Sequence, residues 1–361
     1  MEEDSRSQMR SSASIKDVAA LAGVSISTVS NVLNDTKAVS PALRQKVFDA
    51  ARDLQYQANA IARGLKSGKT NALCVIVPSI VSVFFPRVLH GMQTAAAQKG
   101  YSLSIYETGE DILREQAYIH MLRRQWADGI LISTCANKET DAEYINELRQ
   151  LRIGGKRIPV VFFEAAPDEG LDTVMVDNQE ASRAAALYLI GIGRRKIAYI
   201  AAPRRFAMGR ERFNGYASAL EDAGLKYNPG LVRDGDYTPV SGYALMRSLL
   251  QEGPKPDAVL CGNDQMAVGA IRAILEAGVT IPDEIAVMGF DNNFPGTLVY
   301  PSLSTVSVPK QRMGSEAVEL LLWRMQQGED APSRIVTLET NLIIRESTDK
   351  NAISTWDLFG W

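Results

Sequence analysis

Residues 15–34, IKDVAALAGVSISTVSNVLN, restrict the fold of this chain more than any other segment. The first part favours a short helix, and Gly23 stands where a glycine commonly ends one. Ser25 is a suitable N-cap for a second short helix, over Ile26–Leu33. The apolar residues whose spacing predicts a buried face on each helix are Val18, Leu21, Val29 and Leu33.

Small polar and apolar side chains would then lie on the outer face of the second helix. A helix-turn-helix presents side chains of this kind to the DNA major groove. An ordinary helical hairpin can carry the same caps and spacing, so the segment alone leaves both interpretations open. The residues expected to point outward are Ile26, Ser27, Ser30 and Asn31.

The distribution of charge favours a head that binds a polyanion. Residues 1–70 carry ten lysines and arginines against seven acidic residues, a net charge of +3, and the rest of the chain carries −6. A basic head on an acidic body is typical of a nucleic-acid-binding module attached to a domain with another task.

After a third helix that opens at Ser40-Pro41, the sequence predicts parallel sheets. From residue 72, apolar runs alternate with helix-length segments. Strands joined by helices form sheets covered on both faces, with ligand sites beyond the carboxyl ends of the strands. The expected strands are Leu73–Val77, Leu103–Tyr106, Gly129–Ile132, Val160–Phe163, Ile197–Ile200, Ala258–Cys261 and Ile285–Gly289. The expected helices are 84–99, 111–125, 138–152, 178–192, 210–223, 240–252 and 264–277.

Several classes of protein are not expected. The sequence has no run of 18 apolar residues, and its polar start lacks the apolar core of a secretion signal, so we expect a cytoplasmic protein. Cys74, Cys135, Cys261 and the two histidines lack metal-ligand spacing. With neither a phosphate-binding glycine loop nor a Ser/His/Asp set, we expect no metal, no cofactor and no enzyme.

In order and spacing, several motifs together resemble the lac repressor and purine repressor family of bacterial transcription regulators, over about residues 15–345. They are the segment 15–34, Tyr56–Lys66, Asp128-Gly129, RERFNGY at 210–216, CGNDQMAVGAIRA at 261–273, GFDN at 289–292 and YPSLSTV at 300–306. The resemblance implies a small all-α helix-turn-helix head plus a hinge helix. These would join an α/β core of two doubly wound parallel-sheet subdomains, like the periplasmic binding proteins.

The resemblance also implies the division of the chain. The expected parts are an N-terminal tail 1–14, a DNA-binding domain 15–56, a hinge and linker 57–71, a core 72–345 and a C-terminal tail 346–361. The expected subdomains are 72–177 plus 308–337, and 178–307 plus 338–345.

Because the apolar tail has no leucine heptads, a coiled-coil tetramer is not indicated and a homodimer is expected.

By this resemblance, the chain is expected to bind double-stranded, near-palindromic operator DNA as that homodimer. Asparagine can bond two atoms of adenine, and isoleucine can touch a thymine methyl group. The expected base-reading residues are Ile26, Ser27 and Asn31, and the expected phosphate-binding or capping residues are Ser25, Thr28 and Ser30. The expected minor-groove residues of the hinge are Leu65, flanked by Ala62 and Lys66. Gly64 disfavours helix, so we expect the hinge to fold only on the operator.

The resemblance places a small-molecule effector between the subdomains. The residues expected to bind it are Phe84, Phe85, Glu164, Arg212, Tyr237, Asn263 and Asp291. Carboxylates, an amide, an arginine and an aromatic face suit a polyol, which indicates a repressor of a carbohydrate-utilisation operon. Arg204, Arg205 and Arg210 near the mouth leave a sugar phosphate or sugar acid open. A nucleobase or protein coeffector also stays open, and a soluble sugar-binding receptor is less favoured.

Overall fold

The structure is a computed structural model that describes residues 13–34, 37–56, 70–125, 127–153, 155–328 and 331–352. The expected hinge residues Ala62, Leu65 and Lys66, together with the apolar end of the C-terminal tail, lie outside the described residues. The chain forms two units, 1–70 and 71–361. Among the described residues, no helix is long and apolar enough to cross a membrane.

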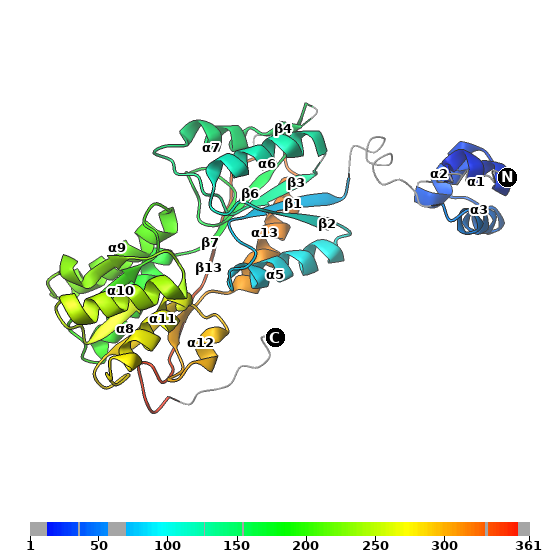
Figure 1. Cartoon of the computed structure of the whole chain (residues 1–361). Helices are drawn as coiled ribbons and strands as arrows, with labels where there is room; N and C mark the ends of the chain where they lie inside the picture. The colour runs from blue at the N-terminus through cyan, green and yellow to red at the C-terminus, as the bar shows by residue number, and fades with distance from the viewer. Residues whose placement is uncertain are drawn as a thin grey trace, which may run out of the picture. The chain divides into compact units, whose positions relative to one another are not determined.

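The head contains the three expected helices, α1 (Ile15–Ala22), α2 (Ile26–Asn34) and α3 (Pro41–Asp53) (Figure 1). Ser14 and Asp17 form a capping box at the start of α1, and Gly23 ends α1 in the left-handed conformation, with φ at 65°. The Ser25 hydroxyl accepts a hydrogen bond from the Thr28 backbone N–H at 3.1 Å, so Ser25 caps α2 as expected.

The core of the head differs in detail from the expected face. Val18, Val29 and Val47 are completely buried where the three helices meet. The prediction that Leu21 is buried is wrong, because 56% of this residue is exposed. On an eight-residue helix the buried stripe is narrow, and Val18 with Ala19 fills it. On α2, Val32 is buried and Leu33 packs only partly against the cluster.

The core unit has two lobes, each with one sheet between helices (Figure 1). The first sheet has the strand order β13-β7-β6-β3-β1-β2, and all its neighbours are parallel. Its strands are β1 (Ala72–Val77), β2 (Ser102–Glu107), β3 (Gly129–Ile132), β6 (Val160–Glu164), β7 (Thr173–Val176) and β13 (Ile335–Leu338). A small hairpin, β4 (Arg152–Ile153) and β5 (Lys156–Arg157), lies outside it.

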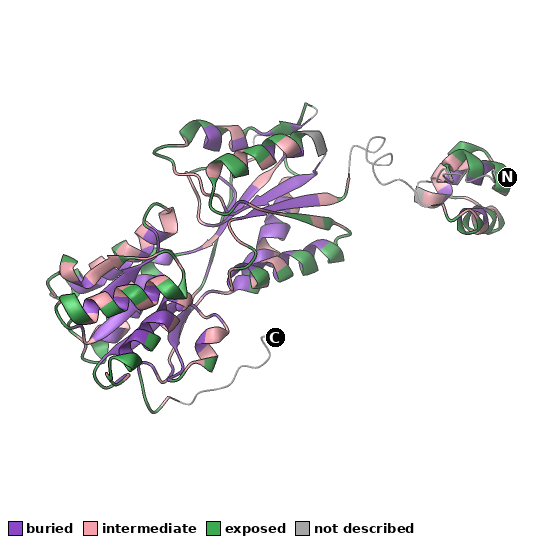
Figure 2. Cartoon of the chain, in the orientation of Figure 1, coloured by how far each residue is buried: buried purple, intermediate pink, exposed green. Residues whose placement is uncertain are grey.

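Successive side chains of a strand point to opposite faces of the sheet, where they contact different helices. In β1, Leu73 and Val75 belong to the apolar cluster that includes α5 (Phe85–Gln98) and α13 (Lys310–Arg324). Cys74 and Ile76 belong to the cluster with α6 (Ile112–Gln125) and α7 (Ala142–Arg149). Both faces of β1 are therefore buried. Figure 2 shows the central strands of the lobe as buried, whereas the edge strand β2 is exposed or partly exposed.

Close helix packing depends on glycine. A Cβ atom on Gly314 of α13 would lie 2.0 Å from the Val88 carbonyl oxygen of α5. A Cβ on Gly91 of α5 would lie 2.0 Å from the Gln311 carbonyl oxygen. The two helices therefore touch backbone to backbone, which brings the start of α13 close to the start of α5.

The second lobe repeats this plan with the strand order β14-β12-β11-β10-β8-β9. Its parallel strands are β8 (Ile197–Ala201), β9 (Val232–Asp234), β10 (Ala258–Cys261), β11 (Ala286–Asp291) and β12 (Ser304–Ser307), and β14 (Asn341–Ile343) joins antiparallel at the edge. Two pairs of helices pack against each other: α8 (Asn178–Gly191) with α9 (Ala207–Asp222), and α10 (Pro239–Glu252) with α11 (Asp264–Glu276). The lobe also contains the short helix α12 (Pro295–Leu298) and a 3₁₀ turn, Pro229–Leu231.

Three connections carry the chain from one sheet to the other. They lie between β7 and α8, between β12 and α13, and between β13 and β14. The seven expected strands and seven expected helices of the core are all present, with ends shifted by a few residues, and the expected fold class is confirmed. The sequence interpretation missed β7, β9, β12, β13 and β14, which are short or lie near sheet edges, and missed the helix α13.

Candidate functional site

The outer face of α2 carries the side chains expected to meet DNA. Ile26 is 45% exposed, so its side chain is available for contact with another molecule. Ser27 is exposed, and Ser30 and Asn31 are partly exposed. The Ser25 hydroxyl lies 2.7 Å from that of Ser27 and 2.8 Å from that of Thr28, so these three hydroxyls form one cluster at the start of the helix.

The core contains a cavity of about 300 Å³ at the carboxyl ends of both sheets. Its lining includes every side chain that the sequence interpretation selected for an effector: Phe84, Phe85, Glu164, Arg212, Tyr237, Asn263 and Asp291. These residues come from six different places in the chain, at the ends of β1, β6, β9, β10 and β11 and on α9. Parallel strands end at the same edge of a sheet, and this geometry gathers them.

Arg212 is the centre of the polar contacts in this cavity. Its Nε donates to Asn178 Oδ1 at 2.9 Å, and Nη1 donates to the Gly262 carbonyl oxygen at 2.7 Å. Nη1 also lies 3.5 Å from Asp291 Oδ1, and the guanidinium carbon lies 3.7 Å from the centre of the Phe290 ring. The guanidinium is thus held in one orientation, with the buried Asp291 carboxyl as its partner.

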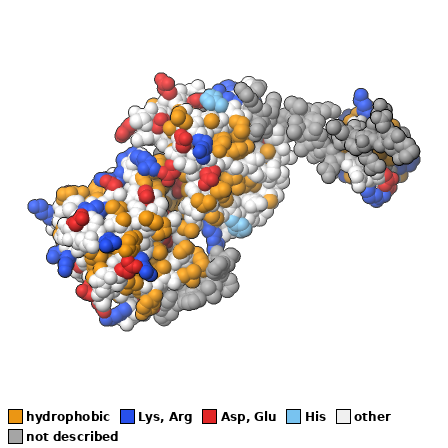
Figure 3. Space-filling model, viewed as in Figure 1, with side chains coloured by type: hydrophobic (Ala, Val, Ile, Leu, Met, Phe, Trp, Pro, Cys, Tyr) orange, Lys and Arg blue, Asp and Glu red, His pale blue; other side chains and the backbone are white. Residues whose placement is uncertain are grey.

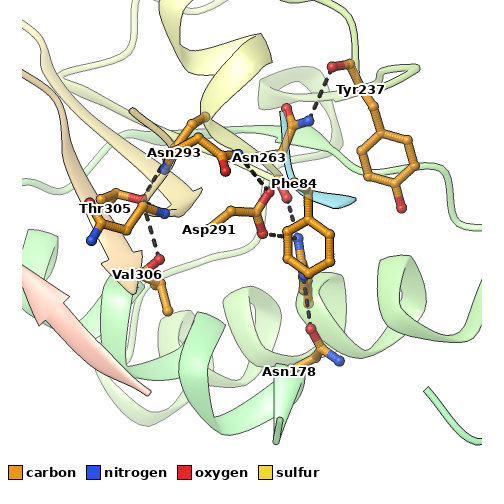
Figure 4. Close-up of polar contacts among 12 residues, drawn as sticks. Phe84, Asn178, Tyr237, Asn263, Asp291, Asn293, Thr305 and Val306 are labelled. Atoms are coloured by element: carbon orange, nitrogen blue, oxygen red, sulfur yellow. Dashed lines mark hydrogen bonds and ion pairs between the residues drawn. The ribbon is translucent and has the colours of Figure 1, made fainter. Parts of the chain in front are cut away.

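Asp291 is buried but only loosely bonded. Its Oδ2 accepts from Asn293 Nδ2 at 3.5 Å, the contact drawn in Figure 4, and burial raises the pKa of its carboxyl against the opposing effect of Arg212. The Lys310 ammonium donates to the backbone carbonyl of Asp291 and, at 3.0 Å, to that of Asn292. Lys310 begins α13 of the first lobe, so it links the two lobes at the cavity; the sequence interpretation missed this residue.

Glu164 is the second buried carboxyl of the lining. Burial raises its pKa to about 7, and the hydrogen bond from the Ser133 hydroxyl and the charge of Arg212 only partly offset this. Ser133 follows β3, the strand beside β6, and is its hydrogen-bond donor within the described residues. An acidic side chain with one partner has acceptor positions left for a bound molecule.

The backbone is strained at the same residues. The φ angles of Glu164, Tyr237 and Asp291 are 73°, 69° and 106°, and that of Glu110, which also lines the cavity, is 62°. Each such conformation costs a non-glycine residue about 1–3 kcal/mol, and clusters of them occur at ligand sites. The strain therefore points to a function of the cavity beyond packing.

Aromatic and amide groups complete the lining. The Tyr237 hydroxyl is buried without a hydrogen-bond partner in the described part of the chain, and its burial raises the pKa of the phenol. Phe84 and Phe85 meet edge to face, with ring centres 5.3 Å apart. Asn263 is bonded on both sides: its Oδ1 accepts from the Met266 N–H as the cap of α11, and its Nδ2 donates to the Tyr237 carbonyl oxygen (Figure 4).

Sequence reasoning missed part of the lining and a buried acid next to it. Asp264, which follows Asn263, is buried beside the cavity; its carboxyl accepts from Thr305 and from the Asn293 N–H, and burial raises its pKa to about 7. The missed lining residues include Glu110, Ser133, Thr134, Phe163, Phe206 and Asp236. A position directly after a strand end is the signal that could have selected Ser133. No group of described His, Cys, Asp and Glu residues could hold a metal ion.

Comparison with known proteins identifies both units. The sequence model described as bacterial regulatory proteins, lacI family, matches residues 14–59, and that of a periplasmic binding protein-like domain matches residues 186–348. The transcriptional repressor PurR of Pasteurella multocida is 33% identical over 336 residues, 93% of this chain and 98% of PurR. The transcriptional regulator RegA of Clostridium saccharobutylicum is 33% identical over 93% of this chain and 99% of its own length.

Comparison with solved structures leads to the same family. The lac repressor dimer bound to operator and the anti-inducer ONPF has a TM-score of 0.85 at 27% identity, covering 94% of this chain and 99% of that one. The regulator CelR in complex with cellobiose has a TM-score of 0.68 at 31% identity, covering 93% and 99%. These relatives are transcription regulators, so the prediction that the chain is not an enzyme is confirmed. The chain therefore belongs to the lacI family of bacterial regulatory proteins, the DNA-binding transcription regulators.

Proposed function

We propose that this regulator represses a carbohydrate-utilisation operon and that a small sugar-like effector, bound in the core cavity, controls its affinity for DNA. The observation that carries the effector site is the cavity itself, because seven expected residues from six different places in the chain line one space of about 300 Å³. Hydroxyl groups of a sugar match its mixture of carboxyls, guanidinium and amide, and the phenylalanine rings provide an apolar face.

On the DNA side, α2 enters the major groove of a near-palindromic operator, with one copy on each half of a homodimer. Its base-reading residues are Ile26, Ser27 and Asn31, and its phosphate-binding or capping residues are Ser25, Thr28 and Ser30. The hinge residues Ala62, Leu65 and Lys66 contact the minor groove at the operator centre. The solved lac repressor dimer on its operator supports this arrangement.

The two lobes correspond to the subdomains 72–177 plus 308–337 and 178–307 plus 338–345, within a cytoplasmic protein. An effector that contacts both lobes stabilises one relative orientation of them, because it binds that state more tightly. The Lys310 contacts with the Asp291 and Asn292 carbonyls lie between the cavity and α13, so they provide a physical connection for this change. A change in operator affinity of about 1–3 kcal/mol is ordinary for such coupling.

A thermal-shift screen tests the proposal. Purified full-length protein and the Asp291→Ala variant are heated with sugars, sugar derivatives and nucleobases, and hits are then added to the protein on operator selected from random DNA. A sugar that raises the melting temperature of the wild type alone, by mass action, and changes operator affinity supports the proposal. A protein that binds operator but responds only to another class of molecule refutes the carbohydrate assignment.

A nucleobase is the second candidate effector, because several relatives that are similar to this chain over most of its length carry the name PurR. A planar base also has edges that donate and accept hydrogen bonds, and faces that stack on aromatic rings. The same screen separates the two candidates, since stabilisation by bases and not by sugars would favour the second.

A further inference from the structure

The ionisable side chains that line the cavity are predominantly acidic. Among the described residues they are Glu110, Glu164, Asp236 and Asp291, against Arg212. Burial opposes ionisation of Asp236, but the hydrogen bonds that its carboxyl accepts from Thr238 outweigh this and lower its pKa. On the face drawn in Figure 3, acidic and basic side chains are interspersed over the core.

The positive charge in the cavity is already engaged. The Arg212 guanidinium bonds Asn178, the Gly262 carbonyl and Asp291, all of which accept. Its Nη2 makes no hydrogen bond within the described part of the chain and is left to donate to a ligand. The single positive charge of a guanidinium that is already paired with the Asp291 carboxyl cannot also neutralise a phosphate or carboxylate of a ligand.

The arginines near the mouth offset only one of these acids, Glu110, and leave Glu164, Asp236 and Asp291 against Arg212. Arg204 donates twice to the Asp234 carboxylate, at 2.6 Å each, and Arg205 forms an ion pair with Glu110. Arg210 donates to the backbone carbonyls of Arg204 and Arg205, at 3.3 and 2.9 Å. The positive charge that left a sugar phosphate or sugar acid open is therefore matched by carboxylates and carbonyls.

The remaining polar positions require a ligand that both donates and accepts hydrogen bonds. Glu164 and Asp291 have acceptor positions left, Arg212 Nη2 has donors left, and the buried Tyr237 hydroxyl has no partner in the described residues. A neutral hydroxyl can serve all of these groups, whereas an ammonium group can only donate. An anion would place a second negative charge beside Glu164 in a poorly solvated space.

We infer that the cavity selects an uncharged, hydroxyl-rich ligand and rejects its phosphorylated and acidic derivatives, and that Glu164 is a main determinant of this rejection. This inference rests on the proposed function, because it concerns the ligand of the same effector site.

The test uses matched sets of ligands on the full-length protein. Each set contains a neutral sugar, its 6-phosphate, its aldonic acid and its 2-amino derivative, with cellobiose and cellobionic acid as a disaccharide pair. Dissociation constants are measured by calorimetry at pH 8.5, where Glu164, whose pKa is about 7, is ionised. The neutral member is expected to bind at least about tenfold more tightly than its anionic counterparts, because like charges at close range are costly. An anionic member that binds as tightly as its neutral counterpart overturns the inference.

Two variants test the assignment to Glu164. Glu164→Gln keeps the shape and the acceptor oxygen but removes the charge, and should reduce the preference for neutral ligands about tenfold. Glu221→Gln is the matched control, because it makes the same substitution at an exposed position of α9 outside the cavity lining, and should change the preference by less than about twofold. An unchanged preference in Glu164→Gln overturns the role of Glu164. Should that variant not fold, Asp236→Asn at the exposed rim must reduce the preference in the same direction, by a smaller factor.

Small anions separate failure of the inference from failure of the proposed function. Inorganic phosphate and citrate are tested on the wild type and on Arg212→Lys. Anions that stabilise the wild type but not the variant occupy the cavity, which overturns the inference whatever the sugars do. If neither sugars nor anions bind, the proposal of a carbohydrate effector is refuted. The inferred rejection of anions is then supported independently of that proposal.

Discussion

The outer face of α2 and the lining of the core cavity use their functional residues in opposite ways. On α2, Ile26 and Ser27 are exposed on a helix whose buried side already contains Val29 and Val32. In the cavity, Arg212 and Asp291 are almost completely buried and bonded to each other and to the backbone. A residue of the first kind can change without disturbing the fold, whereas a residue of the second kind supports the fold and the site together.

The difference has a physical origin. DNA is a large surface that the protein approaches from outside, so its contacts have to be exposed before binding. A small molecule is enclosed, so the groups that hold it are buried beforehand and need partners in the empty protein. Variants in the cavity should therefore lose more stability than variants on α2. Four variants test this difference, in order from the largest expected effect to the smallest.

Arg212→Met should cost about 3–5 kcal/mol of unfolding free energy, because it leaves the Asn178 amide, the Gly262 carbonyl and the Asp291 carboxyl without their buried donor. Urea denaturation measures the change. Arg204→Met is the control, since the Arg204–Asp234 pair is largely exposed, and should cost less than about 1 kcal/mol. Equal losses in the two variants would show that the cavity arginine is not a structural residue.

Glu164→Gln should change how stability depends on pH. The folded state holds the Glu164 proton more tightly than the unfolded chain, so this carboxyl contributes stability below about pH 4.5 that is lost as the pH rises through about 7. Relative to the wild type, the variant should gain up to about 3 kcal/mol between pH 5 and pH 8. Denaturation curves of both proteins at several pH values measure this gain, and a constant difference between them contradicts the expectation.

Ser25→Ala is expected to be an exception to this difference between the two regions, because Ser25 faces the DNA and also caps α2. Loss of the bond to the Thr28 N–H should destabilise the head by about 1 kcal/mol. Hydrogen exchange of the Thr28 amide should become faster. Ser40→Ala is the control: Ser40 precedes α3 but makes no side-chain cap bond, and the exchange of α3 amides should not change.

Ile26→Ala should leave the melting temperature unchanged, because the side chain is 45% exposed. Its affinity for operator selected from random DNA should fall by about 1 kcal/mol, or about fivefold, through the loss of an apolar contact with a base. Leu21→Ala replaces an equally large and more exposed residue of α1, and should change neither quantity. A drop in melting temperature without a drop in affinity would reverse the distinction between the two regions.

Periodicity and capping in the sequence are sufficient to predict the head and most of the core. Alternating apolar runs predicted the central strands β1, β3, β6, β8, β10 and β11, because a strand covered on both faces needs a continuous apolar sequence. They did not predict β13 or β14, because segments of only four and three residues, each with a polar residue, do not by themselves indicate a strand. Exposure of Leu21 was missed for a similar reason: spacing shows which residues can share a face, not how wide the covered stripe is.

The sequence by itself determined the order of the elements and the caps of α1 and α2, because these depend on local patterns. Through its resemblance to the lac repressor and purine repressor family, it also indicated seven of the residues that line the cavity. Only the tertiary structure decided the charge balance of the cavity. Whether Arg205 faces a ligand or Glu110, 95 residues away, depends on how two lobes meet. The same holds for Lys310, which reaches the Asp291 carbonyl from the other lobe, because contacts between distant segments follow from packing and not from spacing along the chain.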